Sequence, residues 1–312
     1  MGEERTGLEL MSETGEEILA RALPRRARDV HKGDCGKVLI IAGGGGMPGA
    51  AVFAARAALR TGSGLVYVCA PKASWPVVQI LAPEAILLDW EEAAAGLVAE
   101  EGEAPRFDAV CFGPGMGTSA AARKKLKALL LSSNLPLVLD ADGLNLAAQN
   151  PDLGQSLKNY TGPKILTPHT GEALRLLDPV YYPDGIQTEE KRMEAAFDLA
   201  WTYRCCAVLK GAGTLTARGI LDRSSSSGGK TEIWENTSGN PGMATAGMGD
   251  VLSGVILSLL GQGAPPWDSA RAGVYLHGLA GDLARKELGE RGMLATDVIE
   301  RLPAVIRGWE GL

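Results

Sequence analysis

Short, unbroken apolar runs that alternate with helical segments constrain the fold of this chain more than any other feature. The runs are Lys37–Ala42, Leu65–Cys69, Ala109–Gly113, Leu137–Leu139, Lys164–Leu166 and Cys206–Lys210. Continuous rather than alternating apolar patterns are typical of parallel strands that are buried on both faces. Helical periodicity lies between them, in Ala50–Arg60, Ala120–Leu131, Gly171–Leu177 and Glu189–Tyr203. This order predicts a three-layer α/β/α sandwich with a mostly parallel central sheet.

The last third of the chain changes pattern. Short strands are predicted near Leu215–Leu221, and the run Ser224–Gly229 is typical of an exposed hairpin tip. Helical segments follow at Met248–Leu260, Ser269–Leu288 and Ala295–Trp309. No internal repeat or long linker divides the 312 residues. We therefore expect an N-terminal arm over residues 1–30, with a short helix, and one domain over residues 31–312.

Composition and charge exclude several classes of protein. The net charge is −6 and no Lys/Arg cluster suits a phosphate backbone, so nucleic-acid binding is not expected. No stretch approaches eighteen apolar residues, so no membrane span is expected, and Met1–Glu17 lacks the pattern of a signal peptide. The five cysteines form no C-x-x-C pair. They are typical of reduced, mostly buried thiols, and we predict a cytoplasmic protein.

The first glycine-rich loop follows the run Lys37–Ala42. Gly44, Gly46 and Gly49 satisfy G-x-G-x-x-G, a signature of dinucleotide-binding Rossmann folds. That signature also needs an acidic residue at the end of the next strand, where this chain has Ala70-Pro71. The loop still lets a pyrophosphate approach the backbone, but a Rossmann oxidoreductase is not supported.

Two further loops follow predicted strands, where doubly wound folds bind ligands. Gly113–Gly117 leaves space for a ligand against the main chain, although a tight turn explains this loop equally well. Thr167–Glu172 contains His169, one of only three histidines. Its place between a strand and a helix favours ligand contact over a purely structural role. Glu172 is positioned to complement the helix dipole.

The fourth loop, Asn236–Asp250, carries the strongest signal. Gly247 and Gly249 free the backbone, so the amides of Gly247, Met248 and Gly249 are predicted to form an anion hole at a helix start. Asp250 follows within the first turn of that helix. It is either an ordinary capping acid, which would stabilise the helix by about 1 kcal/mol, or a catalytic carboxylate. The long glycine-rich loop that precedes it favours the catalytic role.

Together these loops resemble the ADP/ATP-dependent NAD(P)H-hydrate dehydratase family of the ribokinase-like superfamily, over nearly the whole chain. The matching segments are HKGDCGKVLIIAGG, MPGAA, GPGMG, LDADGLN, ILTPHTGEA, VLKGAGTLTA and GNPGMATAGMGDVLSG. G-x-G-D alone indicates only the superfamily, whereas TPHTGE and VLKGAGT are more specific. Thr170 stands where proline is common and Met248 where a Ser or Thr is usual, which affects local loop shape.

The resemblance implies roles for individual residues. Those implied to contact the hydrated nicotinamide nucleotide are Ala50, Gly115, His169 and Asp250. Those implied to bind ADP or ATP are Lys210, Gly211, Ala212, Gly213, Thr214 and Gly249. It also implies Mg²⁺, for which the sequence assigns no ligand, and a homo-oligomer, with a tetramer as one arrangement. Only about thirty residues precede the match, so we expect a dehydratase acting on the S epimer of hydrated NADH or NADPH and a separate epimerase.

The implied mechanism makes a hydroxyl into a better leaving group by phosphorylating it. Asp250 would accept the hydroxyl proton, and with an ordinary pKa of about 3.9 it would be a weak base. No Walker A sequence is present, so a P-loop NTPase is excluded. Two alternatives stay open: a ribokinase-like kinase acting on a hydroxymethylpyrimidine or hydroxyethylthiazole, and a nucleotide-binding protein without catalysis.

Overall fold

A computed structural model describes residues 8–99, 106–220 and 230–311 of the chain. Its strands are β1 (Leu8–Leu10), β2 (Lys37–Ile41), β3 (Leu65–Cys69), β4 (Ile86–Leu88), β5 (Ala109–Phe112), β6 (Leu137–Leu139), β7 (Lys164–Leu166), β8 (Cys206–Leu209), β9 (Leu215–Ile220) and β10 (Lys230–Glu235). Its α-helices are α1 (Gly15–Ala22), α2 (Pro48–Thr61), α3 (Trp75–Leu81), α4 (Trp90–Leu97), α5 (Ala120–Ser132), α6 (Asp142–Gln149), α7 (Pro151–Asn159), α8 (Thr170–Leu176), α9 (Glu189–Tyr203), α10 (Met248–Gly261), α11 (Pro266–Leu288) and α12 (Ala295–Glu310). The predicted hairpin tip Ser224–Gly229 lies outside the described residues.

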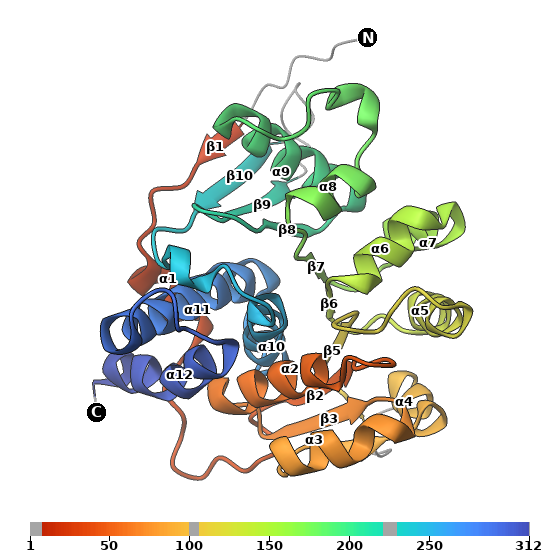
Figure 1. The fold of residues 1–312 in the computed structure, drawn as a ribbon, viewed down its shortest axis with the longest axis vertical. Coiled ribbons are helices and arrows are strands. Elements are labelled where there is room, and N and C mark those ends of the chain that lie inside the picture. The colour runs from red at the N-terminus through yellow and green to blue at the C-terminus, as the bar shows by residue number, and fades with distance from the viewer. Residues whose placement is uncertain (1–7, 100–105, 221–229, 312) are drawn as a thin grey trace.

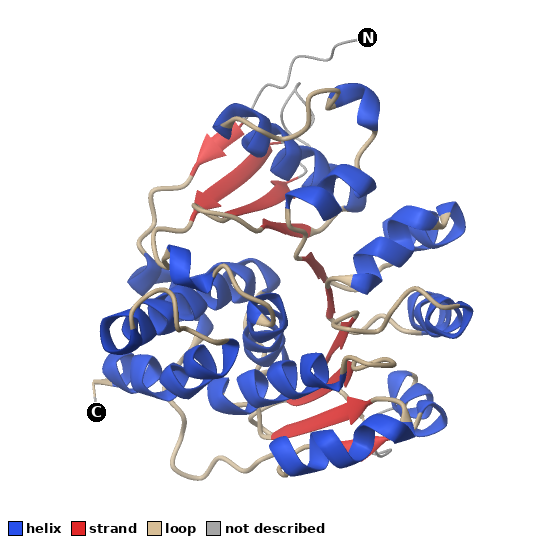
Figure 2. Ribbon diagram, in the orientation of Figure 1, coloured by secondary structure: helices blue, strands red, loops and turns tan. Residues whose placement is uncertain are grey.

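The described strands form one sheet in the order β1-β10-β9-β8-β7-β6-β5-β2-β3-β4 (Figure 2). All neighbouring strands are parallel except β9, which runs antiparallel to both β8 and β10. Helices α1, α2, α3 and α10–α12 contribute to the core on one face, and α4–α9 to the core on the other (Figure 1). The predicted three-layer, mostly parallel α/β/α sandwich is confirmed.

Strand β2 shows why the apolar runs are continuous. Val38 and Ile40 belong to one core, whereas Leu39 and Ile41 belong to the other, so every second residue serves the opposite face. The six predicted strands match the observed ones to within one residue at each end. The apolar and helical patterns of the sequence did not predict β1, β4 or helices α3, α4, α6 and α7.

The strand order reverses at β2, which pairs with β3 on one side and β5 on the other. In doubly wound sheets the carboxyl ends of the strands beside such a reversal leave a crevice for ligands. The glycine loops after β2 and β5 meet there, where the Gly43 amide donates to the Pro114 carbonyl at 3.0 Å. The topology therefore brings two of the predicted loops together.

Helices α2 and α10 lie together on one face of the sheet. A Cβ at Gly254 of α10 would overlap the Ala54 carbonyl of α2, so only glycine permits this approach. Almost every residue from Val251 to Gly261 is buried, because α2, α11 and the sheet enclose α10. Burial on all sides explains why apolar residues occur around the whole circumference of α10.

The N-terminal arm extends the sheet as well as packing on it. Strand β1 runs parallel to β10, and α1 begins with a capping box between Thr14 and Glu17. The indole Nε1 of Trp234 donates to the Glu13 carbonyl at 2.9 Å. The predicted short helix is confirmed. The strand was not predicted, because its sequence LEL contains a glutamate and forms no continuous apolar run.

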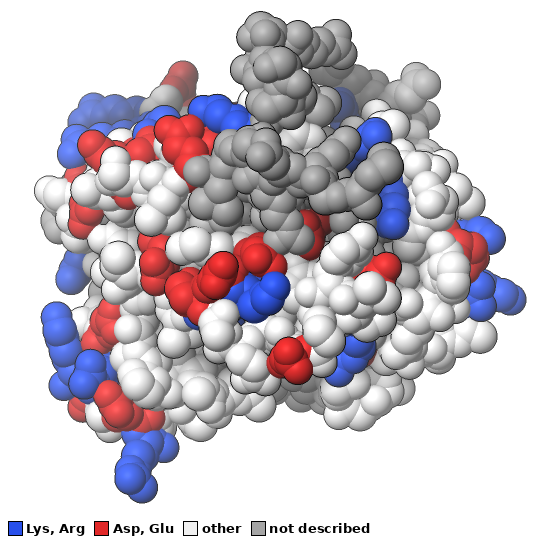
Figure 3. Space-filling view, turned by 90° about the horizontal axis from the view of Figure 1, so that it is seen from above, with Lys and Arg blue, Asp and Glu red and all other residues white. Residues whose placement is uncertain are grey.

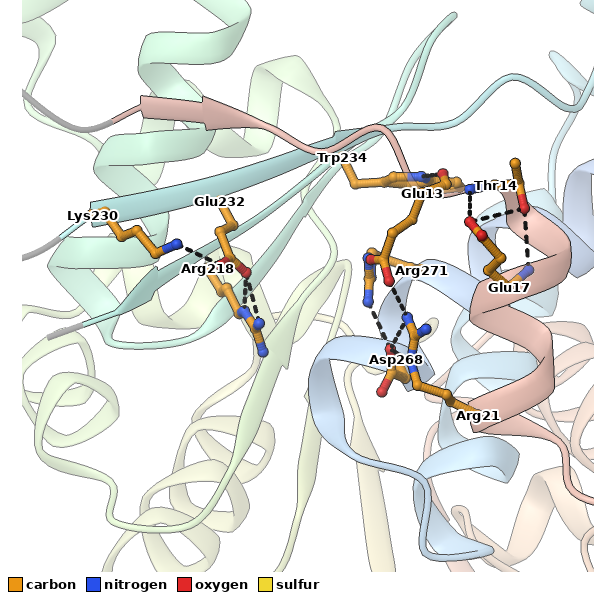
Figure 4. A network of polar contacts seen from close by, with 10 residues as sticks. All are labelled: Glu13, Thr14, Glu17, Arg21, Arg218, Lys230, Glu232, Trp234, Asp268 and Arg271. Atoms are coloured by element: carbon orange, nitrogen blue, oxygen red, sulfur yellow. Dashed lines mark hydrogen bonds and ion pairs between the residues drawn. The ribbon is translucent and has the colours of Figure 1, made fainter. Parts of the chain in front are cut away.

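A buried ion-pair network joins the arm to α11 (Figure 4). Arg271 is 1% exposed and its guanidinium contacts Glu13 and, at 2.7 Å, Asp268. Arg21 of α1 pairs with the same two carboxylates. The Arg271 guanidinium also lies over the Trp267 ring, 4.4 Å from its centre. The network fixes the arm to the helix that borders the candidate site described below.

The described helices, the surface charges and the cysteines can be compared with the predictions from composition. No described helix is long and apolar enough to cross a membrane. On the face in Figure 3, the visible Lys and Arg side chains do not form one continuous patch. All five cysteines are buried, as predicted, and none of them is paired in a disulfide.

We predict that Asp268→Asn lowers the free energy of unfolding by about 3 kcal/mol, because it leaves a buried arginine with one carboxylate fewer. Chemical denaturation measures the change. Glu287→Gln is the control, since its pair with Arg301 is half exposed on the Glu287 side and should contribute under about 1 kcal/mol. Equal losses for the two variants would contradict a stabilising role for the network.

Candidate active site

The residues predicted to contact substrate lie at the carboxyl edge of the sheet. Gly115 adopts φ +58°, and a Cβ there would lie 2.8 Å from the Ala50 Cβ, so these two predicted residues are in contact. The amide of Gly117 donates to Asp142 Oδ2 at 2.7 Å. The Gly113–Gly117 loop is therefore tied both to the start of α2 and to the residues that follow β6.

A buried cluster of charges lies beside these loops. Lys210 Nζ donates to Asp140 Oδ1 at 2.7 Å, and Ser253 Oγ donates to Asp140 Oδ2, also at 2.7 Å. Asp140 is 1% exposed, and Glu172 Oε2 lies 3.8 Å from Lys210 Nζ. Burial disfavours the ammonium, but Asp140 and Glu172 outweigh it and raise the pKa of Lys210. The lysine is a fixed cation at this edge of the sheet.

His169 occupies the N-cap of α8 and lies next to Lys210. Its Nδ1 accepts from the Gly171 amide at 3.0 Å, and its own amide donates to Glu172 Oε2 at 2.9 Å. A backbone bridge joins His169 to Lys210. The imidazole is 54% exposed, with Nε2 3.4 Å from Glu172 Oε1. His169 thus caps a helix and still presents its ring at the edge where the predicted substrate residues gather.

Asp250 lies in the first turn of α10. The N-cap Gly247 has φ +87°, and no side chain caps the helix, so its first amides are free to bind an anion. Within the described chain, the Asp250 carboxylate forms no hydrogen bond, which does not support a capping role.

The sequence-based expectation of an ordinary pKa for Asp250 is wrong. Burial, reinforced by the carboxylate of Asp140 and less strongly by Asp142, and opposed by Lys210, raises the pKa of Asp250 to about 7. The charged form loses hydration in this partly enclosed position and meets other negative charges. A carboxylate with this pKa is a much better base at neutral pH than an exposed aspartate.

A cavity of about 530 Å³ lies next to this cluster. All the residues predicted to bind the adenine nucleotide line it, namely Lys210, Gly211, Ala212, Gly213, Thr214 and Gly249. Gly213 has φ +60°, a conformation that favours glycine. Met248 of the predicted anion hole also lines the cavity, together with Leu252, Val274 and His277. The residues of α10 and α11 that line the cavity are mostly apolar, and Lys210 of the charged cluster also belongs to its lining.

One wall of the cavity is the loop Asn236–Met243, which α11 holds in place. The amide of Gly239 and the side chain of Asn240 each donate to the Asp282 carboxylate, at 2.9 Å. Ser238 Oγ donates to the Tyr275 carbonyl at 3.0 Å. The wall is therefore fixed by hydrogen bonds to a single buried helix.

The sequence and the fold match one known family. The family model described as NAD(P)H-hydrate dehydratase matches residues 38–304, most of the chain. The chain belongs to the NAD(P)H-hydrate dehydratase family.

Individual relatives agree with the family match. A bifunctional NAD(P)H-hydrate repair enzyme of Moorella thermoacetica is 37% identical over 92% of this chain and 52% of its own length. The chain thus spans about half the length of the bifunctional relatives. An ADP-dependent (S)-NAD(P)H-hydrate dehydratase of Neisseria meningitidis is 37% identical over 88% of this chain and 86% of its own length.

Solved structures agree with the fold. The ADP/ATP-dependent NAD(P)H-hydrate dehydratase of Bacillus subtilis, co-crystallised with ATP and Mg²⁺, superposes with a TM-score of 0.77. It is 30% identical and covers 95% of this chain and 97% of its own. A ribokinase-like superfamily protein of Enterococcus faecalis gives a TM-score of 0.76 at 26% identity, with 99% of both chains covered.

Several residues of this dehydratase-family site were not identified as functional from the sequence. Asp140 stands in the LDADGLN segment and Ser253 in MGDVLSG, so the segments were noted without these side chains. His277 and Asp282 lie within α11, where nothing but helical periodicity marked them. A polar residue at the end of a buried strand was the available signal for Asp140.

The described residues contain no group of three or more His, Cys, Asp or Glu side chains that could hold a metal ion. Magnesium commonly keeps several waters and binds through substrate phosphates with few protein ligands. The Bacillus subtilis relative was co-crystallised with ATP and Mg²⁺, and no protein ligand to the ion is assigned in this chain.

We predict that Asp250→Asn becomes more stable than the wild type as pH rises. A carboxyl whose pKa is raised on folding contributes stability that is complete below its unfolded pKa, near 4. That contribution declines as the pH rises and is lost by about pH 7, the pKa in the folded protein. The amide does not ionise, so the variant gains up to about 1.4 kcal/mol per pH unit between pH 5 and 7 relative to wild type.

Denaturation at pH 5, 6, 7 and 8 measures this difference. Asp152→Asn is the control, because Arg123 and Lys127 hold the pKa of the Asp152 carboxyl below its ordinary value despite some desolvation. Its stability difference from wild type should stay constant over that range. A constant difference for Asp250→Asn as well would contradict the raised pKa.

Proposed function

We propose that this chain uses ADP or ATP to dehydrate the S epimer of hydrated NADH or NADPH, restoring NADH or NADPH. The observation that carries the proposal is that Asp250 directly follows Gly249, which lines the 530 Å³ cavity together with the other predicted nucleotide residues. Family membership and the printed activities of the Neisseria and Bacillus relatives support the same reaction.

The cavity residues have the first part in the reaction, which is to hold the phosphoryl donor. The loop Gly211–Thr214 and the apolar side chains of α10 and α11 enclose the nucleotide, with its phosphates toward Lys210 and the start of α10. The free amides of Gly247, Met248 and Gly249 and the helix dipole, worth about half a positive charge, stabilise the transferred phosphoryl group. Lys210, fixed by Asp140, adds a full positive charge beside them.

Asp250 has the second part, which is proton transfer. The substrate hydroxyl lies against its carboxylate and gives up its proton as the oxygen bonds to the terminal phosphorus of the nucleotide, while the bond from that phosphorus to the bridging oxygen breaks and releases ADP from ATP or AMP from ADP. The C–O bond of the substrate then breaks with phosphate as the leaving group, driven by the lone pair of the ring nitrogen, and loss of a ring proton restores the dihydronicotinamide ring of NADH or NADPH. Magnesium, when bound to the phosphates, supplies neutralisation of their charge.

The substrate side of the site would be formed by Ala50, Gly115 and His169. Ala50 and Gly115 contact each other, and His169 lies beside Lys210 of the charged cluster. We further propose that residues 31–312 act as one domain, that the protein forms a homo-oligomer, and that a separate epimerase supplies the S epimer.

The test is incubation of the protein with hydrated NADH and either ADP or ATP. We expect inorganic phosphate together with a rise in the absorbance of NADH. A stable phosphorylated product without phosphate release would instead identify a kinase of the same superfamily. Binding of nucleotide without any turnover would contradict an enzymatic function.

We predict that Asp250→Asn lowers kcat by about 10²–10⁴-fold, the usual contribution of general-base catalysis. For the wild type, kcat/KM should fall as pH drops through about 7, because protonation of Asp250 removes the base. Steady-state kinetics from pH 5.5 to 8.5 measure both effects. A folded variant that keeps more than about a tenth of wild-type kcat would falsify the assignment.

We predict that His169→Ala raises KM for hydrated NADH while the affinity for ADP stays nearly the same, since His169 does not line the nucleotide cavity. His169→Asn is the matched variant, because asparagine is a good N-cap. If His169 contacts substrate, both variants raise KM. If it only caps α8, asparagine restores both KM and the melting temperature.

A further inference from the structure

His277 of α11 lines the nucleotide cavity and is 8% exposed. Its Nε2 is fully buried and has no hydrogen-bond partner among the described residues. Among the described residues, only three other side-chain atoms are buried without a hydrogen-bond partner: Thr61 Oγ1, Thr216 Oγ1 and Arg271 Nε. None of these three residues lines the cavity. His277 is thus an unpartnered polar group at a predicted binding site.

An unpaired buried nitrogen is unfavourable, and native proteins satisfy most such groups. The imidazole is neutral, because burial, reinforced by the positive charge of Lys210, lowers the pKa of His277 to about 4. A neutral imidazole has one donor and one acceptor nitrogen, so it suits a polar neutral or anionic partner. The surroundings of His277 therefore fit hydrogen bonding to a ligand better than an ion pair.

The wall around His277 is rigid and uses other residues of α11. Tyr275 and Asp282 accept hydrogen bonds from the loop Asn236–Met243. Gly278 lies so close to Ser238 that a Cβ there would overlap its hydroxyl. These residues hold the loop on the helix, while His277 takes no part in holding it and adjoins the cavity.

We propose that His277 is a nucleotide-binding residue, and that a polar group of bound ADP or ATP provides the hydrogen bond that its imidazole lacks. The inference rests on the proposed function, since it assumes that the cavity holds an adenine nucleotide. Because His277 lines the cavity while its Nε2 is buried, the proposed bond requires the imidazole to turn toward the ligand when it forms. His277 would thus add a contact from α11 to those from the Gly211–Thr214 loop.

The test is calorimetry of ADP binding to His277→Leu, His277→Gln and the wild type. We expect leucine to weaken ADP binding roughly three- to tenfold, the value of one net hydrogen bond. Glutamine places an amide near the position of Nε2 and should retain most of the affinity. Without ligand, His277→Leu should melt at the same temperature as the wild type or higher, because it removes an unsatisfied nitrogen, and ADP should raise that temperature less.

Thr216→Val is the matched control, because it removes another buried, unpartnered atom that lies away from the cavity. Its ADP affinity should equal that of the wild type. Separate titrations with adenosine and pyrophosphate show which part of the nucleotide His277 contacts. Weaker binding of either probe to His277→Leu supports the inference.

Two results separate failure of the inference from failure of the proposed function. Wild-type protein that binds neither ADP nor ATP overturns the proposed function and this inference with it. Wild-type protein that binds ADP, together with a His277→Leu variant of unchanged affinity and lowered melting temperature, overturns only the inference. In that case His277 would be a structural residue.

Discussion

The ion pair between Lys210 and Asp140 is the interaction on which the rest of the site depends. It joins residues 70 positions apart, one beyond β6 and one beyond β8, at the carboxyl edge of the sheet. Neither charge would be tolerated alone at this depth, because removal of one partner leaves the other buried and uncompensated. Ser253 of α10 donates to the same carboxylate, so the pair also fixes the helix that bears Asp250.

This arrangement is compatible with the proposed binding of phosphates by a protein whose net charge is −6. The positive potential is local, supplied by one lysine and the free amides at the start of α10. The carboxylates around them hold the lysine in place, and burial together with these negative charges raises the pKa of Asp250. The proposed binding of anions and the proposed acceptance of a proton thus depend on the same few side chains, each influenced by its neighbours.

The sequence predicts the sheet well because strands buried on both faces leave continuous apolar runs. It misses β1 and β4, which are only three residues long and lie at the two edges of the sheet. The six residues that it predicts to bind the nucleotide line one cavity, and all of them except Gly249 are contiguous in the sequence. The raised pKa of Asp250 could not be predicted, since it depends on burial and on Asp140, which is distant in sequence. His277 escaped notice for a related reason: a histidine within a helix reveals nothing of the cavity beside it.

The contact of Gly254 with Ala54 has a consequence for motion. Helices α2 and α10 meet backbone to backbone at this point, so no side chain there can change rotamer and let them slide. Ala50 lies in the first turn of one helix and Asp250 in the first turn of the other, so the crossing limits how far these two residues can move apart. Larger movements at this edge of the sheet are left to the loops, such as the exposed Gly45–Met47 segment.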